Sequence, residues 1–255
     1  MKSLKEELSR NFRSFGNELK GKYVETFTTL ETNEGKYLES YERLSTLEAW
    51  RAYLLEYCIS GSSLNFFLEA QNDALLAHTF ARIGSWRTAL QSLRSLIENT
   101  LFCLYYKDHP VELNLWENGK HQQSVSDYIA YIAKHPRFYS VNANITGVAL
   151  LKKEYSTLSK AVHGSSRSFR MTKKEDDFPA LMIPDITKLN QWLTREAKAI
   201  QIVNQVLITM FSEHLQAAKL RNLRKSVSFA IPTNLYTQIR DQFGIRLFKI
   251  PPENP

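Results

Sequence analysis

The residues with the clearest chemical potential in this chain lie where one helical pattern ends. The segment from Leu151 to His163 is amphipathic, and Gly164 suits the left-handed position that commonly follows a helix. Tyr155, Ser159 and His163 are spaced by four residues, so they share one helix face. Since a helix C-terminus favours a positive imidazole, we expect a protonated His163 to form an anion-binding cluster with the polar and basic residues that follow it. The alternative is that His163 only ends its helix.

Basic residues follow this histidine directly. The polar segment after it, which we expect to be a loop, carries four cations: Arg167, Arg170, Lys173 and Lys174. Together with Ser159 and Arg87 they are the predicted nucleic-acid-binding residues, which would hold phosphates without reading base sequence. The phosphates of a small nucleotide suit the same cluster equally well.

A second charged face lies on the helical pattern "SWRTALQSLRSLIENTLF". Arg87, Arg94 and Glu98 follow one another at offsets of seven and four, and Arg94 can pair with Glu98 along the helix. In a groove, this pair would bind a phosphate or orient a histidine. The alternative is an ordinary solvated face beside a leucine stripe.

Other reactive residue types lack a recognisable pattern. Asp108, His109 and Glu112 have no known metal-ligand spacing, and we expect a structured turn there. Cys58 and Cys103 lie in apolar helical patterns, which predicts small buried side chains. The absence of P-loop, GxGxxG, GxSxG and CxxC motifs argues against P-loop hydrolases, dinucleotide oxidoreductases and serine hydrolases. We expect no metal and no cofactor.

The elements that must position these residues are predicted to be helices. Glycine and proline are scarce, and apolar residues recur with helical spacing. We expect helices over residues 4–19, 46–57, 64–84, 86–106, 125–134, 146–163, 186–223 and 234–243, with loop and short helix over 21–45. The very short joint near Gly84 predicts an antiparallel hairpin. The fold class is therefore all-α, an up-and-down helical bundle.

The end of the chain has a different character. "SVSFAI" and "IRLFKI" are short β-prone runs, so we expect a small α/β appendage in which they pair. The predicted organisation is an N-terminal helical segment over 1–62, a bundle core over 63–225 and the C-terminal appendage over 226–255.

The Arg–Glu helix, the break at "DHP" and the later "YSTLSKAVHGS" helix together resemble bacterial proteins of the HEPN superfamily. Many such proteins are ribonucleases or nucleotide-binding partners in toxin–antitoxin and phage-defence systems. The resemblance covers about residues 64–170. Catalytic members carry an arginine followed by a histidine after four to six residues, and none of the six histidines here has an arginine at that offset. If this chain is a catalytic member of the superfamily, its fold must bring His163 and Arg94 together from different helices.

The resemblance implies a bacterial defence or toxin-type protein that acts on RNA or nucleotides. His163 would serve in metal-independent phosphodiester cleavage, Arg94 would stabilise the phosphorane, and Glu98 would orient either of them. The alternatives are a non-enzymatic module that binds a partner protein, such as one encoded in the same operon, and a sensor of a small nucleotide. HEPN proteins commonly form dimers, so we further expect a homodimer, with the amphipathic N-terminal helix as its interface. We expect a cytoplasmic location. We expect no membrane association, because no apolar run approaches the roughly 20 residues that span a bilayer.

Overall fold

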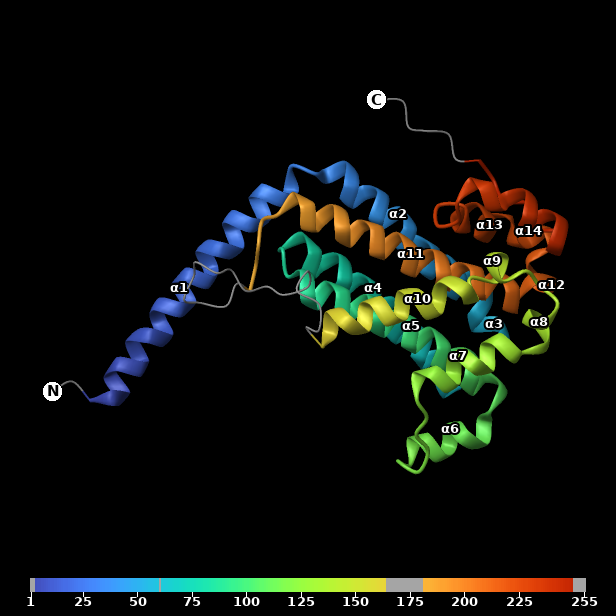
Figure 1. The fold of residues 1–255 in the computed structure, drawn as a ribbon, viewed down its shortest axis with the longest axis horizontal. Coiled ribbons are helices and arrows are strands. Elements are labelled where there is room, and N and C mark those ends of the chain that lie inside the picture. Colours follow the sequence, from blue (N-terminus) through green and yellow to red (C-terminus); the bar gives the residue numbers. More distant parts are fainter. Residues whose placement is uncertain (1–2, 60, 164–180, 250–255) are drawn as a thin grey trace.

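The computed structural model describes residues 3–59, 61–163 and 181–249. Every regular element in these ranges is helical and none is a strand, which confirms the all-α prediction (Figure 1). From the N-terminus to the middle of the chain, the helices are α1 (Leu4–Glu31), α2 (Glu34–Trp50), the π-helical turn η1 (Arg51–Leu55), α3 (Glu56–Cys58), α4 (Ser62–Arg82), α5 (Trp86–Asp108), α6 (Pro110–Glu117) and α7 (Val125–Lys134).

The rest of the chain continues the bundle and then adds a unit of short helices. The elements are α8 (Pro136–Tyr139), α9 (Ala143–Thr146), α10 (Val148–Val162), α11 (Ile186–Met210), α12 (Ser212–Leu215), the 3₁₀ turn η3 (Ala218–Leu220), α13 (Arg221–Val227), the 3₁₀ turn η4 (Thr233–Leu235) and α14 (Tyr236–Phe243).

Helix α5 is the centre of the bundle. It packs against α4, α7, α10 and α11, and its predicted leucine stripe is buried. Leu93 and Leu104 are fully buried, and Ile97 and Leu101 are nearly so. At about 25 cal/mol per Å² of apolar surface, burial of such a side chain stabilises the fold by roughly 1.5–3 kcal/mol. Helix α5 therefore provides a rigid support for the charged residues on its remaining face.

The hairpin of α4 and α5 depends on Gly84. This residue has a positive φ of 68°, and a Cβ atom there would lie 2.6 Å from the carbonyl oxygen of Ile183. The segment that leads into α11 rests on this turn, because Ile183 N–H donates to the Gly84 carbonyl at 3.1 Å and Trp86 Nε1 donates to the Ile183 carbonyl at 2.9 Å. Glycine is required here both for its conformation and for the close approach.

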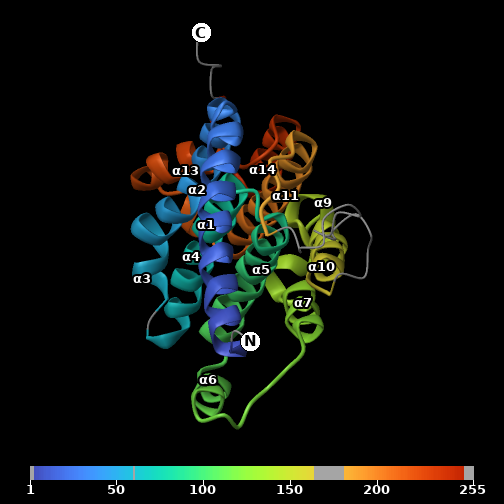
Figure 2. The same ribbon diagram turned by 90° about the vertical axis from the view of Figure 1, so that its left-hand side faces the viewer.

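Helix α1 extends well beyond the sequence prediction and projects from the bundle. Its only buried residues are Thr26 and Leu30, near its end, and Figure 1 shows the rest leaving the body of the molecule. Figure 2 views the molecule from the side on which α1 projects, with α1 in front of the bundle. The prediction of loop and short helix over 21–45 was wrong, since α1 continues to Glu31 and α2 begins at Glu34. The part of α1 after residue 20 is mostly solvent-exposed, so it needs no apolar stripe, and its sequence contains no proline.

Helix α11 is shorter than predicted. It ends at Met210, and the chain turns through α12 and η3 before α13. No glycine or proline marks this break, so the apolar period suggested one continuous helix. The guanidinium of Arg224 donates to the carbonyl oxygens of Leu215 and Ala217, at 2.5 and 2.8 Å, which satisfies acceptors that a continuous helix would have paired.

The predicted C-terminal strand pair is absent from residues 226–249. The first run lies at the end of α13 and in the following turn, whereas residues 245–249 form neither a helix nor a strand. The two runs do meet, because Phe248 N–H donates to the Ser228 hydroxyl at 3.0 Å. The alternation that suggested a strand instead buries Ile245 and Leu247 and exposes Arg246 between them. The predicted helix between the runs occurs as η4 and α14, and Gly244 ends it with a φ of 69°.

The predicted domain boundaries stay a prediction. The boundary after residue 225 falls within α13, and α13 packs on α2. Buried residues on both sides of each boundary, from Leu30 to Leu247, belong to one hydrophobic cluster.

Candidate functional site

The register of α5 against α10 places the predicted site residues. Arg87 Nη2 donates to the Val162 carbonyl oxygen at 2.6 Å, and Arg94 Nη2 donates to the Tyr155 hydroxyl at 2.9 Å. Moving seven residues forward on α5 thus corresponds to moving seven backward on α10, as in an antiparallel pair. We refer to this line of contacts as the α5–α10 edge.

Arg94, Glu98 and Tyr155 form a closed polar cluster on this edge. Arg94 Nη2 lies 2.8 Å from Glu98 Oε1, and the Tyr155 hydroxyl donates to the same oxygen at 2.6 Å. The guanidinium carbon of Arg94 also lies 5.3 Å from the centre of the Tyr155 ring. The side chains of Arg94 and Glu98 are 24% and 20% exposed, so solvent reaches a cluster that is otherwise held between two helices. The predicted Arg94–Glu98 pair is therefore present, with a tyrosine as its third member.

Burial and charge act against each other in this cluster. Burial raises the pKa of Tyr155, the hydrogen bond to Glu98 raises it further, and Arg94 lowers it. Burial alone would lower the pKa of Arg94, but its bonds to Tyr155 and Glu98 outweigh that effect, and the pKa lies above its usual range. Tyr155 therefore stays a neutral hydroxyl and Arg94 a full positive charge.

His163 follows α10 directly and is exposed. Its backbone N–H donates to the Ser159 carbonyl at 3.1 Å. From the register it lies beside Arg87, seven residues from the level of Arg94, which is about 10 Å along the helix axis at 1.5 Å per residue. The structure brings Arg94 and Glu98 together and leaves His163 apart from both.

The remaining predicted residues divide into two groups. The Ser159 hydroxyl donates to the Tyr155 carbonyl at 2.8 Å, a bond within the helix, and Arg87 lies at the His163 end of the edge. The other four, Arg167, Arg170, Lys173 and Lys174, lie outside the residues that the structure describes. Tyr155 was not predicted as a site residue, although its spacing from Ser159 and His163 placed it on the same face.

A second ionisable cluster lies inside the bundle. Glu196 on α11 is fully buried and receives hydrogen bonds from Arg43 on α2, from Nη2 at 2.6 Å and Nε at 2.8 Å. Burial raises the pKa of Glu196 to about 7, against the lowering effect of Arg43. Close by, His78 on α4 shares a 3.0 Å hydrogen bond with Ser40, and burial lowers its pKa to about 4. Because Glu196 and Ser40 are fully buried and Arg43 and His78 are partly so, we interpret the cluster as a structural link between α2, α4 and α11.

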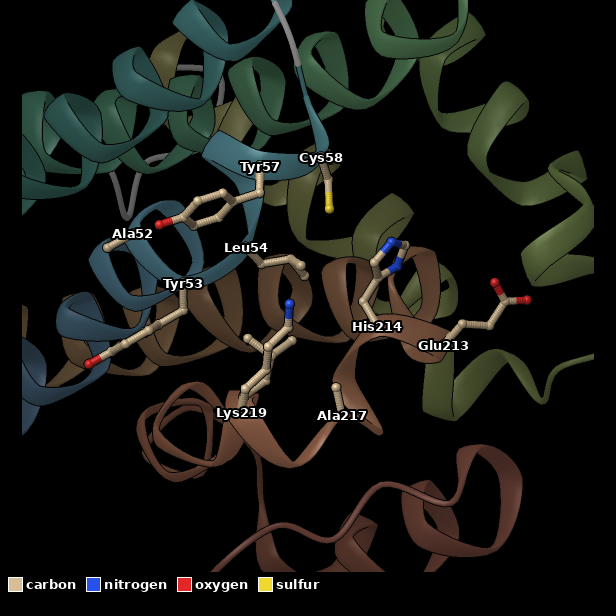
Figure 3. A pocket seen from close by; sticks show the side chains of 10 residues that line it. Ala52, Tyr53, Leu54, Tyr57, Cys58, Glu213, His214, Ala217 and Lys219 are labelled. Carbon is tan, nitrogen blue, oxygen red and sulfur yellow. The ribbon is translucent and has the colours of Figure 1, made fainter.

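A pocket of about 500 Å³ opens beside the π-helical turn η1. Figure 3 shows Tyr57 and Cys58 on one wall, with Lys219 and His214 pointing toward them from the opposite wall. π-Helical turns often occur at functional sites. However, burial raises the pKa of the Cys58 thiol more than Lys219 lowers it, so Cys58 is not an activated nucleophile. The pocket is suited to binding rather than to covalent chemistry.

Two further features concern the described residues as a whole. They contain no group of three or more His, Cys, Asp or Glu side chains placed to hold a metal ion. None of the helices within these ranges combines the length and the apolar character that crossing a bilayer requires.

We compared the chain with protein-family models, curated proteins and solved structures, and nothing matched. The resemblance to HEPN proteins therefore stays a prediction.

Proposed function

We propose that this protein binds RNA or nucleotides at the α5–α10 edge, as a divergent HEPN-like protein of bacterial defence or toxin–antitoxin type. The observation that carries the proposal is the cluster of Arg94, Glu98 and Tyr155, which is partly open to solvent and lies in line with Arg87 and the exposed His163. A phosphate that approaches Arg94 meets a preorganised guanidinium, because Glu98 and Tyr155 already fix its orientation.

Binding is better supported than cleavage. In cleavage, the 2′-hydroxyl of RNA attacks the adjacent phosphorus, a base accepts the hydroxyl proton and an acid protonates the leaving oxygen. Glu98 is close enough to Arg94 for both to serve one phosphate, but His163 lies about 10 Å away along the edge. Cleavage by His163 and Arg94 together would require the end of α10 to move toward Arg94 on α5. We therefore propose cleavage only as the enzymatic form of this function.

The test uses labelled single-stranded RNA at low salt, with product size and binding measured on the same samples. Arg94→Gln should weaken binding, because it removes the charge and keeps much of the side chain. His163→Ala is compared with His214→Ala, which removes another exposed histidine on α12. Cleavage that His163→Ala alone abolishes would establish a ribonuclease. If the native protein neither binds nor cleaves RNA or a mononucleotide, the proposal is wrong.

A non-enzymatic module that binds a partner protein is a second candidate, and α1 favours it. Leu4, Leu8, Phe12 and Phe15 repeat at offsets of four and three, and their exposed fractions run from 41% to 76%. A stripe of this size on a projecting helix is suited to packing against another helix, either of a partner or of a second copy of this chain. Apolar packing responds little to salt, whereas phosphate binding weakens steeply as salt rises, and this difference separates the two candidates.

A further inference from the structure

The positive charge of this protein is concentrated in its C-terminal unit. The whole chain has 33 Lys and Arg against 26 Asp and Glu, a net charge of +7. Seven of these cations and only one acidic residue, Asp241, lie between Ala218 and Lys249. The unit therefore carries +6, and the remaining residues, with 26 cations and 25 anions, are almost neutral. Such segregation is costly for a compact unit unless an anion offsets the repulsion.

Structural tasks account for some of these cations. Arg224 donates to the Leu215 and Ala217 carbonyls, the Arg221 guanidinium lies 5.7 Å from the centre of the Phe248 ring, and Arg240 pairs with Asp241 at 2.9 Å. Neither Arg246 nor Lys249 has a carboxylate within ion-pair distance in the part of the chain that the structure describes.

The backbone around these two cations is held in place. Residues 245–249 form neither a helix nor a strand, with Ile245 and Leu247 buried and Arg246 and Lys249 exposed. The hydrogen bond from Phe248 N–H to Ser228 ties this segment to the end of α13. The two cations are thus presented by an anchored segment, which lowers the entropy lost when a ligand binds.

Arg246 and Lys249 line a pocket of about 490 Å³ together with Arg240 and Thr237 of α14. Two aromatic residues, Tyr236 and Phe248, also line this pocket. The Tyr236 hydroxyl donates to the Ser228 carbonyl at 2.9 Å, which fixes its ring. Three cations, a hydroxyl and two aromatic rings around one pocket match the parts of a nucleotide: cations for phosphate, a hydroxyl for phosphate or sugar, and rings for a base.

We propose that this C-terminal pocket binds a nucleotide unit of single-stranded RNA, with Arg246 and Lys249 holding its phosphates. In naming RNA, the inference rests on the proposed function. The pocket is nevertheless separate from the α5–α10 edge, because α13 and α14 lie at the opposite end of the bundle from the C-terminal end of α10 (Figure 1). It acts as a second anchor, and a strand that reaches both places binds more tightly than either site alone.

The experiment measures the anisotropy of fluorescent single-stranded RNA, about 20 nucleotides long so that it exceeds a typical single-stranded site. The affinity is measured over a range of salt concentrations. The test variant carries Arg246→Gln and Lys249→Gln, two exposed changes with little effect on packing. The control carries Lys5→Gln and Lys20→Gln, which remove the same charge from exposed positions on α1. Thermal melting checks that both variants fold.

We expect the test variant to lose about tenfold or more in RNA affinity at low salt. The slope of log affinity against log salt should become shallower by about 1.4, that is 0.7 for each lost phosphate contact. The control should stay within about twofold of the native protein. Equal affinities for the test and control variants would overturn the inference, as would charge-dependent binding to vesicles rich in phosphatidylserine without binding to RNA.

The same assay separates this inference from the proposed function. Loss of affinity in Arg94→Gln but not in the C-terminal variant supports the α5–α10 edge and overturns the second anchor. The reverse result supports the C-terminal pocket and overturns the edge as an RNA-binding site. If the native protein binds no RNA, the second anchor is wrong, whereas the proposed function is wrong only if the protein also binds no mononucleotide.

Discussion

At the scale of single residues, Tyr155 joins the two charged groups of the α5–α10 edge. Its hydroxyl donates to Glu98 and accepts from Arg94, so one oxygen links α10 to two positions on α5. Tyr155→Phe keeps the ring and removes this oxygen. We expect a loss of about 1–2 kcal/mol in the free energy of unfolding, because the bonds are to charged groups but only partly buried. Urea denaturation measures it. Tyr139→Phe is the control, since Tyr139 is 85% exposed. Equal stability of the two variants would show that the cluster is not a structural link.

Glu196 should make stability depend on pH. Its pKa rises from 4.5 to about 7 on folding, so the native state binds more protons in that range and stability falls as pH rises through it. His78 acts in the opposite direction, because a pKa lowered from 6.5 to about 4 makes stability rise with pH. In the native protein the two effects largely cancel between pH 4.5 and 6.5.

Glu196→Gln removes the contribution of Glu196 to the pH dependence of stability and leaves that of His78. The unfolding free energy of the variant minus that of the native protein should increase between pH 4.5 and 7, by up to about 3 kcal/mol, and stay constant above pH 7. Chemical denaturation at several pH values gives this difference curve, in which all unchanged groups cancel. A flat curve would mean that Glu196 remains ionised throughout.

At the scale of elements, two glycines offer a matched comparison. Gly84→Ala places a Cβ against the Ile183 carbonyl at a positive φ, and we expect a loss of about 2 kcal/mol or more. Gly16→Ala lies within α1 with no other atom in contact range, so higher helix propensity should leave stability unchanged or raise it by up to about 1 kcal/mol. Thermal melting of both variants checks this. If Gly84→Ala melts like the native protein, the turn is not the constraint we describe.

The elements also show which parts of the fold could be predicted from sequence. The apolar period located α5 and α7 because each buries one face, and Gly84 and Gly244 marked helix ends because both need a positive φ. The period gave no signal over residues 21–45, where most of the helical surface faces water. It gave a false signal beyond Met210, where α11 ends and Arg224, a residue from another helix, satisfies the carbonyls of Leu215 and Ala217. The alternation at residues 245–249 indicated burial correctly but not a ladder.

For the candidate site, too, local features could be predicted from the sequence and features that depend on helix packing could not. The pairing of Arg94 with Glu98 is local, one helical turn apart, so the sequence predicted it. The role of Tyr155 depends on the register of α5 against α10, which is set by core packing between helices far apart in the chain. The separation of His163 from Arg94, about 10 Å along the helix axis, has the same origin.

At the scale of the whole molecule, the projecting α1 should govern association. Leu8→Ser with Phe12→Ser should leave the melting temperature nearly unchanged, because both side chains are exposed, and should abolish any self-association. Sedimentation velocity at several concentrations measures the oligomeric state. Leu75→Ser with Leu76→Ser, on the exposed face of α4, is the control. A native protein that remains monomeric at all concentrations would contradict a homodimer formed through α1.

The uneven distribution of charge also gives the molecule a large electric dipole. Residues 1–217 carry a net charge of +2 and residues 218–255 carry +5, so the field of a polyanion turns the molecule with its C-terminal unit foremost. The orientation of the encounter is therefore set before any contact forms, and the α5–α10 edge follows at a fixed distance behind the point of first contact. Reversing charges on α13 and α14 would slow the association of the protein with a polyanion and change the orientation in which the two meet. The α5–α10 edge would remain intact.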